Sequence, residues 1–356
     1  MMTAAAGVKN GVPLPLAKAW IAKARTTGDA GFYTLAEQAL DCQISRNPDD
    51  VDAVRLKAHV WIQFHRFAEV EKIATELVAT HAGVLDYMLL GDAQMEQGKL
   101  DAARESYQKA MNIRPSIDLY DRVGWLRWLW GDIDGAEEMA NLAVQAGTTD
   151  DPETFAWVLT RLGWLHALRG KPYPEIEAAL RLVPHYKPAL FANARIIMES
   201  DPELAAAQLR EVGATVEARW ALLEFEPNVT VDAVPPWLAD VKLQDPRGYA
   251  IAISDADPAA ALAILDEELK VRQDATTHMA HAYALYAANL PGAEPEARAA
   301  LATGIVEPRV LLQAGQILED PALLVRARSF GPGLTKIERA RAEVGEFVYR
   351  RHSAKP

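Results

Sequence analysis

Residues 87–146 read YMLLGDAQMEQGKLDAARESYQKAMNIRPSIDLYDRVGWLRWLWGDIDGAEEMANLAVQA and contain one helical pattern twice. The second copy follows the first at a constant offset of 33 residues, so that Gly124 repeats Gly91 and Ala136 repeats Ala103. Self-similarity at a fixed period is typical of an array of stacked repeats. The shared positions are Tyr87, Leu90, Gly91, Gly98, Leu100, Ala103 and Ala110 in the first copy and Tyr120, Val123, Gly124, Gly131, Ile133, Ala136 and Ala143 in the second.

Each copy predicts two antiparallel helices joined by a tight turn. Residues four apart lie on the same face of a helix, so Tyr87 and Gly91 form a stripe that a neighbouring helix can approach closely. Gly98 and Gly131 fall at the bend between the two helices, where a residue that tolerates positive φ is needed. One hairpin cannot bury its apolar face alone, and we therefore expect further hairpins stacked on both sides.

Weaker copies of the hairpin are predicted along most of the remaining chain. Asp-Pro pairs begin at residues 151, 201, 245, 257 and 320, and they predict helix starts. The Asp side chain accepts hydrogen bonds from the free backbone N–H groups at a helix N-terminus, and proline is tolerated at the first helical position. Thr335 and Glu338 predict a capping box at the start of a final helix that reaches about Arg351. We expect a flexible leader at 1–12, a repeat array at 13–213, an irregular helix or linker at 214–247, helical hairpins at 248–334, and a capping helix and tail at 335–356.

Composition and charge exclude several classes of protein. The chain has 356 residues, of which 50% are hydrophobic and 24% charged, and this composition excludes a disordered protein. Its net charge of −12 argues against a surface for nucleic acid or anionic membranes. Cys42 is the single cysteine, so no intrachain disulfide is expected. Because no signal peptide or membrane span is recognisable, we expect a cytoplasmic protein.

The charge is unevenly distributed along the chain. Residues 1–30 carry a net charge of +3 and residues 326–356 carry +5, which leaves −20 for the residues between them. Basic ends on an acidic body either favour end-to-end self-association or simply keep the terminal helices soluble.

Residues 51–184 resemble the tetratricopeptide-repeat family, in the large multi-repeat form found in bacteria, and the other hairpins resemble it more weakly. The resemblance implies an all-α fold, a right-handed α-solenoid of helical hairpins. It also implies that a peptide or protein segment binds in the concave groove, which the first helix of each hairpin lines. Repeat motifs specify architecture better than they specify function.

The register of the family places a set of candidate groove residues on these first helices. They are Arg55, His59 and Ile62 in the second hairpin, Met88, Asp92, Met95 and Glu96 in the third, Asp118, Asp121, Trp125 and Trp128 in the fourth, Trp157, Thr160 and Trp164 in the fifth, and Phe191 and Arg195 in the sixth. Tryptophan is enriched at binding hot spots, and the carboxylates would select a basic or N–H-rich ligand. The alternatives are that the tryptophans pack against neighbouring helices or plug the superhelix, and that the carboxylates form a solvated face.

No catalytic motif is present, and we expect neither an enzyme nor a cofactor or metal. His278 and His281 share a helix face at a spacing that a metal site can use, but no further ligand stands at a matching position. Three readings remain open. They are a protein-binding scaffold, a regulatory or substrate-presenting subunit of an enzyme complex, and a small-ligand carrier or enzyme that uses residues 226–247 with Trp237.

Overall fold

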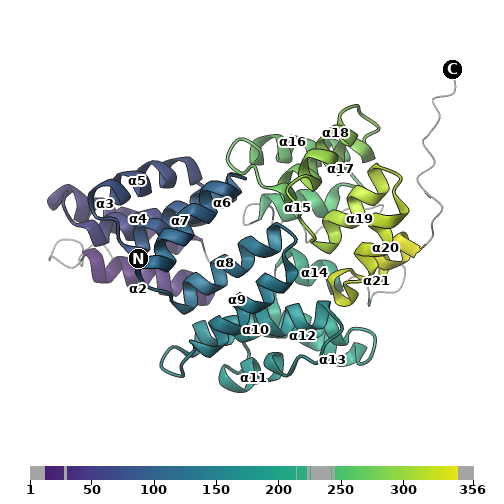
Figure 1. Ribbon diagram of the computed structural model, residues 1–356, viewed down its shortest axis with the longest axis horizontal. Helices are drawn as coiled ribbons and strands as arrows, with labels where there is room; N and C mark the ends of the chain where they lie inside the picture. Colours follow the sequence, from purple (N-terminus) through teal and green to yellow (C-terminus); the bar gives the residue numbers. More distant parts are fainter. Residues whose placement is uncertain are drawn as a thin grey trace. The chain divides into compact units, whose positions relative to one another are not determined.

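The computed structural model describes residues 13–27, 30–213, 215–222, 225, 242 and 245–343, and within these ranges it is entirely helical (Figure 1). Tertiary contacts divide the chain into two compact units, Met1–Pro115 and Ser116–Pro356. The predicted all-helical hairpin array is confirmed. The sequence does not reveal the division after residue 115. In the described residues no helix combines the length and the apolar character needed to cross a membrane.

The first unit is built from three helical hairpins. Each helix contacts the next along the chain, and the first helices of neighbouring hairpins, α4 and α6, also contact each other. The helices are α2 (Pro13–Thr27), α3 (Gly31–Arg46), α4 (Val51–Gln63), α5 (Phe67–Thr80), α6 (Val84–Glu96) and α7 (Leu100–Ile113).

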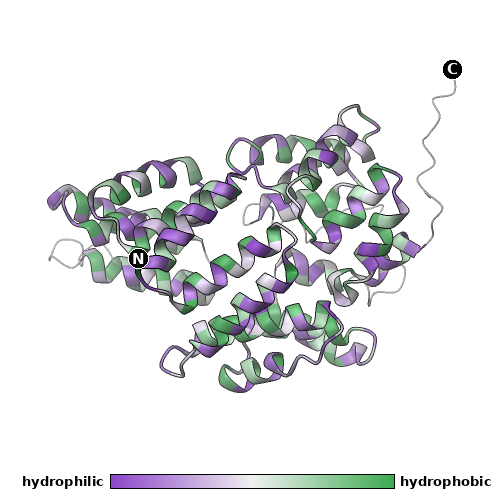
Figure 2. Ribbon diagram, viewed as in Figure 1, coloured by the Kyte–Doolittle hydropathy of each residue, from purple (hydrophilic) through white to green (hydrophobic). Residues whose placement is uncertain are grey.

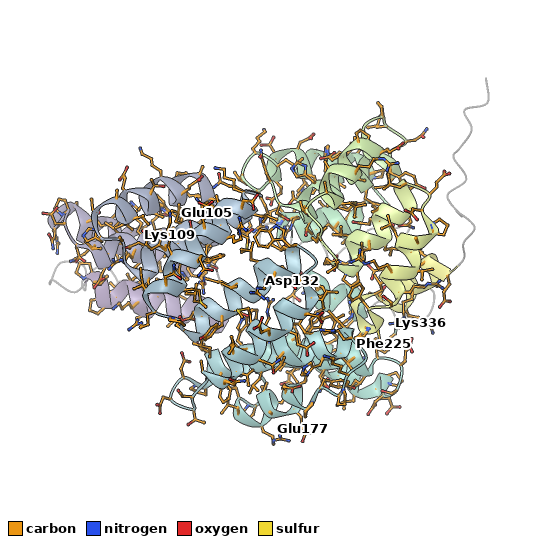
Figure 3. The ribbon with its side chains drawn as sticks, viewed as in Figure 1. Glu105, Lys109, Asp132, Glu177, Phe225 and Lys336 are labelled. Atoms are coloured by element: carbon orange, nitrogen blue, oxygen red, sulfur yellow. The ribbon has the colours of Figure 1, made fainter. Side chains whose placement is uncertain are left out.

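Helix α7 shows how the repeat pattern creates a buried face. Ala103 and Tyr107 are buried, whereas Glu105 and Lys109 are exposed on the other side of the helix (Figure 3). The same separation of polar and apolar residues runs along the other helices (Figure 2). A Cβ atom at Gly91 would lie 2.5 Å from the Tyr107 ring, which explains why the repeat requires a small residue there.

The second unit is also built from helical hairpins. Its helices are α8 (Ile117–Leu129), α9 (Ile133–Gln145), α10 (Pro152–Leu168), α11 (Pro174–Leu182), α12 (Lys187–Ile197), α13 (Pro202–Val212), α14 (Val216–Leu222), α15 (Pro246–Ile253), α16 (Pro258–Glu268), α17 (Ala275–Ala287), α18 (Ala293–Leu301), α19 (Pro308–Ile317), α20 (Pro321–Arg328), the 3-10 turn η3 (Gly331–Gly333) and α21 (Lys336–Glu343). Each helix again contacts the next along the chain.

Local sequence signals set most helix starts in this unit. Each of the five Asp-Pro pairs caps a helix, with Pro in the first turn and the Asp side chain accepting a backbone N–H. The predicted capping box is also confirmed, since Thr335 N donates to Glu338 at 2.8 Å and Glu338 N donates to Thr335 at 3.2 Å. Residues 344–351 of the predicted capping helix and Trp237 lie outside the described residues.

The second unit closes on itself. The turn after α8 meets the turn after α18, where the backbones of Gly131 and Gly304 touch. A Cβ atom at Gly131 would lie 2.4 Å from the Gly304 carbonyl oxygen, and one at Gly304 would lie 2.6 Å from the Trp130 carbonyl oxygen. One buried apolar cluster accordingly joins α8–α10 to residues 306–342. Its buried members are Trp128, Ala136, Leu168, Val306, Leu311, Leu312, Leu324, Ala327, Phe330, Leu334 and Ala342.

A clasp of charged side chains joins α17 to α18. The Nδ1 atoms of His278 and His281 lie 3.0 and 2.7 Å from the two carboxylate oxygens of Glu296, and His281 Nε2 lies 3.3 Å from Asp266. Although burial opposes it, hydrogen bonds from both histidines lower the pKa of Glu296 to about 2. The hydrogen bond to Glu296 raises the pKa of His281 above 6.5. Among the described residues no group of three or more His, Cys, Asp or Glu side chains could hold a metal ion.

We expect Gly131→Ala to destabilise the second unit more than Gly170→Ala does. Both glycines follow the first helix of a hairpin with positive φ, +74° and +65°, so both substitutions carry the strain of about 1–2 kcal/mol for an L-residue. Only Gly131 faces another backbone, because nothing lies within 4 Å of a Cβ at Gly170. At Gly131, overpacking should lower the free energy of unfolding by about 1–3 kcal/mol more. Chemical denaturation of both variants measures this difference. Equal losses would mean that the Gly131–Gly304 approach does not hold the unit closed.

The clasp between α17 and α18 should stabilise the protein most between about pH 4.5 and 6.5. The raised pKa of His281 gives a contribution that is complete below 6.5 and is lost as pH rises through its folded value. The lowered pKa of Glu296 gives a contribution that is present above 4.5 and is lost as pH falls toward about 2. The free energies of unfolding of the wild type and of His281→Gln should therefore differ more at pH 5.5 than at pH 8. An NMR titration midpoint for His281 at or below 6.5 would contradict this expectation.

Candidate tryptophan pocket

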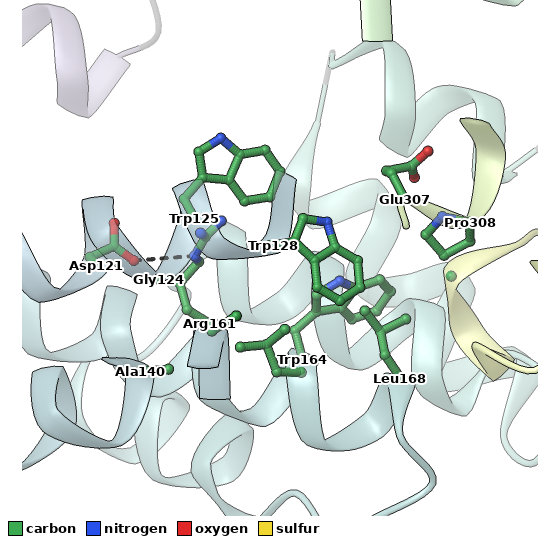
Figure 4. Close-up of a pocket in the computed structure, with 13 residues that line it drawn as sticks. Asp121, Gly124, Trp125, Trp128, Ala140, Arg161, Trp164, Leu168, Glu307 and Pro308 are labelled. Atoms are coloured by element: carbon green, nitrogen blue, oxygen red, sulfur yellow. Dashed lines mark ion pairs between the residues drawn. The ribbon is translucent and has the colours of Figure 1, made fainter. Parts of the chain in front are cut away.

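A partly enclosed pocket lies in the second unit, where α8, α9 and α10 meet the C-terminal hairpin of α19 and α20 (Figure 4). Its cavity measures about 150 Å³. The first helices contribute most of its wall, and residues 307, 308 and 333 complete it from the closing side. The lining residues are Asp121, Gly124, Trp125, Trp128, Ala136, Ala140, Arg161, Trp164, Leu165, Leu168, Glu307, Pro308 and Gly333.

The tryptophans of the pocket come from two helices. Trp125 and Trp128 are three residues apart on α8 and therefore lie on neighbouring parts of one helix face. Trp128 is buried, with 4% of its surface exposed, and its ring meets the Phe330 ring edge-on at a centroid distance of 5.9 Å. Trp125 and Trp164 remain half-buried. Trp128 therefore forms the fixed floor of the pocket, while Trp125 and Trp164 can meet a ligand.

Arg161 holds one edge of the pocket in place. Its Nε atom lies 3.2 Å from Asp121 Oδ1, and Trp157 Nε1 donates a hydrogen bond of 2.9 Å to Asp121 Oδ2. The guanidinium carbon lies 4.7 Å from the centre of the Trp125 ring and 5.7 Å from that of Trp157. Arg161 and Trp157 of this chain thus occupy Asp121, for which the sequence predicts a basic or N–H-rich ligand.

Glu307 lies at the other edge of the pocket. Its Oε2 atom caps α19 by accepting a hydrogen bond of 2.8 Å from Val310 N. Burial raises the pKa of the Glu307 carboxyl, against the opposing effects of Arg309 and this backbone hydrogen bond. Arg309 itself forms an ion pair of 2.7 Å with Glu338. Arg309 therefore attracts Glu307 while its direct ion pair is with Glu338.

The candidate groove residues of the first unit are mostly held by neighbouring side chains. Arg55 donates to the buried carboxylate of Asp86 at 2.7 and 2.9 Å, and Asp92 accepts a hydrogen bond of 2.6 Å from Tyr107. Met88 and Met95 are buried. His59 and Glu96 are half-buried. The first unit thus shows ion pairs and packing at these positions rather than open groove chemistry.

In the second unit the structure brings five of the candidates together. Asp121, Trp125, Trp128 and Trp164 line the pocket, and Trp157 donates a hydrogen bond to Asp121 beside it. Asp118 is exposed one helical turn before Asp121. The buried Trp128 matches the alternative that an aromatic residue packs against other helices.

Sequence reasoning missed three contributors to this site, Arg161, Glu307 and Phe330. The spacing of Trp157 and Arg161, four residues apart on one helix, indicates an aromatic–cation contact and could have identified Arg161. No local pattern marks Glu307 or Phe330 as neighbours of the tryptophans.

The comparisons with known proteins agree with this repeat register. The family model of the tetratricopeptide repeat matches residues 87–117, which comprise α7 and most of α6. Residues 87–117 therefore match a tetratricopeptide repeat, and the hairpin that follows, α8 and α9, repeats its glycine and alanine positions. A search of curated protein sequences finds no match.

Solved structures show only a general likeness. The APC/C hetero-tetramer Cut9-Hcn1 is 17% identical with a TM-score of 0.47, and the match covers 84% of this chain and 54% of that chain. The chain thus spans about half the length of that protein. Yeast Tom70 is 12% identical with a TM-score of 0.41, over 95% of this chain and 93% of that chain. Identities and TM-scores this low say nothing about partners.

Replacing Trp128 with Ala should destabilise the second unit by about 3–5 kcal/mol, because a buried indole that packs on Phe330 is lost. Trp157→Ala is the matched control, since Trp157 is 38% exposed and its polar contact is a single hydrogen bond worth about 1 kcal/mol. Chemical denaturation of both variants tests this difference. A Trp128→Ala protein as stable as wild type would place Trp128 outside the core.

Proposed function

We propose that the protein is an interaction scaffold that binds a segment of a partner protein, and that the tryptophan pocket of the second unit anchors one side chain of that segment. The observation that carries this proposal is the pocket itself, since it combines two half-buried tryptophans with a fixed apolar floor. Stacked repeats commonly offer such surfaces to other proteins. Tryptophan is among the residues most enriched at binding hot spots.

The size of the pocket supports a side chain as its occupant. An apolar cavity of about 150 Å³ is large enough to hold a benzene molecule. The tryptophan pocket has about the same volume, and it is open on one side. One ring or one branched or extended side chain therefore fits, with the rest of the segment lying outside.

The surroundings of the pocket would supply the rest of the interface. Trp157 is 38% exposed beside Arg161, and Asp118 is exposed on the same helix as Trp125. Because Asp121 holds Arg161 and Trp157 in place, the rim is ordered before a partner arrives. Such preorganisation lowers the entropic cost of association.

Filling the pocket should abolish binding without unfolding the protein. Ala140 lines the pocket on α9, and Ala140→Leu would occupy part of its volume. Ala299→Leu on the exposed face of α18 is the matched control. Phage displaying random peptides would be selected on the full chain of each protein, and melting curves would show that all three are folded.

We expect wild type and Ala299→Leu to enrich the same peptides, and Ala140→Leu to enrich them at least about tenfold less, as expected for the loss of a hot spot. If Ala140→Leu retains these peptides at wild-type levels, the pocket is not the anchor. The partner segment would then have to bind to other exposed candidate groove residues on the first helices.

A further inference from the structure

We infer that the side chain received by the tryptophan pocket is positively charged, an arginine or a lysine of the partner segment. This inference rests on the proposed function and names the chemistry of its anchor. It follows from two observations on the described residues, the indole faces that line the pocket and the balance of charges at its rim.

The pocket walls favour a cation. Three of its lining residues are tryptophans, and tryptophan is the side chain that attracts cations most strongly through its ring face. The structure already contains one such contact, because the Arg161 guanidinium lies over the rings of Trp125 and Trp157. A second cation that enters between Trp125 and Trp164 would meet indole surface of the same kind.

One rim carboxyl group, that of Glu307, has no direct ion pair with a described residue. Arg161 is paired with Asp121, and Arg309 is paired with Glu338. Within the described part of the chain, Glu307 forms no direct ion pair, although Arg309 attracts it, and it accepts a hydrogen bond from the backbone N–H of Val310. A ligand cation would give Glu307 a direct ion pair.

Other occupants fit the pocket less well. An anion would approach Glu307, while the cation that could attract it, Arg161, is already neutralised by Asp121. A neutral apolar side chain fits the volume but makes no contact that uses the Glu307 carboxyl at the rim. The net charge of −12 also speeds the approach of a basic partner.

Choline and 3,3-dimethylbutan-1-ol form a probe pair that isolates the charge, because they have nearly the same shape and only choline is a cation. Each would be titrated into the full chain while the isotope-labelled indole N–H signals are followed by NMR. The signals of Trp125, Trp128 and Trp164 would be assigned from single Trp→Phe variants. We expect both probes to shift these signals, and choline to bind at least about tenfold more tightly.

Two variants then test the role of Glu307. Glu307→Gln removes the charge and keeps an oxygen that can cap α19. The affinity for choline should therefore fall to about the affinity for the alcohol. Asp257→Asn makes the same change of charge at the cap of α16, where Asp257 accepts a hydrogen bond from Ala260, and should leave the preference unchanged.

Each other outcome overturns the inference. Equal binding of both probes would show an apolar pocket, and the proposed function would still stand. A preference for choline that survives in Glu307→Gln would show that Glu307 is not the charge partner. If neither probe moves the indole signals, the inference fails, and the peptide selection with Ala140→Leu decides separately whether the proposed function survives.

Discussion

The contact between the backbones of Gly131 and Gly304 is the constraint on which the second unit depends. Two hairpin turns approach so closely there that neither residue can carry a Cβ atom. This contact brings the C-terminal hairpin onto α8–α10, and Phe330 then covers Trp128. Without closure, Glu307, Pro308 and Gly333 would not complete the wall opposite the tryptophans, and an open face would replace the pocket.

Closure also separates the tryptophans by role. Trp128 becomes part of the core, and its burial stabilises the contact between distant hairpins. Trp125 and Trp164 lie on the same two helices but keep accessible surface. Because Trp128 is fixed by Phe330 and Arg161 is fixed by Asp121, a ligand would meet a site whose walls need little ordering. A pocket of this kind gains affinity from rigidity as well as from contact area.

The local features of this fold could be predicted from the sequence, whereas closure could not. The 33-residue period, the turn glycines and the Asp-Pro caps act within a few residues, and the helices begin close to the predicted positions. The Gly131–Gly304 contact joins residues far apart in the chain, and it depends on small rotations that accumulate over several hairpins. Trp128 illustrates the result, since its register position predicts a groove residue while closure buries it. Trp125 has the same register assignment and stays half-buried, packed against the apolar cluster that contains Trp128.

Charged residues on the first helices show a second limit of prediction from register. Arg55 on α4 pairs with Asp86 on α6, and Arg161 on α10 pairs with Asp121 on α8. In both cases an arginine and a carboxylate from neighbouring hairpins neutralise each other, so the two hairpins hold their relative position and little charge is left for a ligand. A carboxylate at a groove position therefore indicates binding only after the neighbouring hairpins have been searched for its partner. Glu307 differs from these carboxylates because it forms no direct ion pair within the described residues, and Arg309, which attracts it, is paired with Glu338. Its position at the start of α19 gives no sign of this in the sequence.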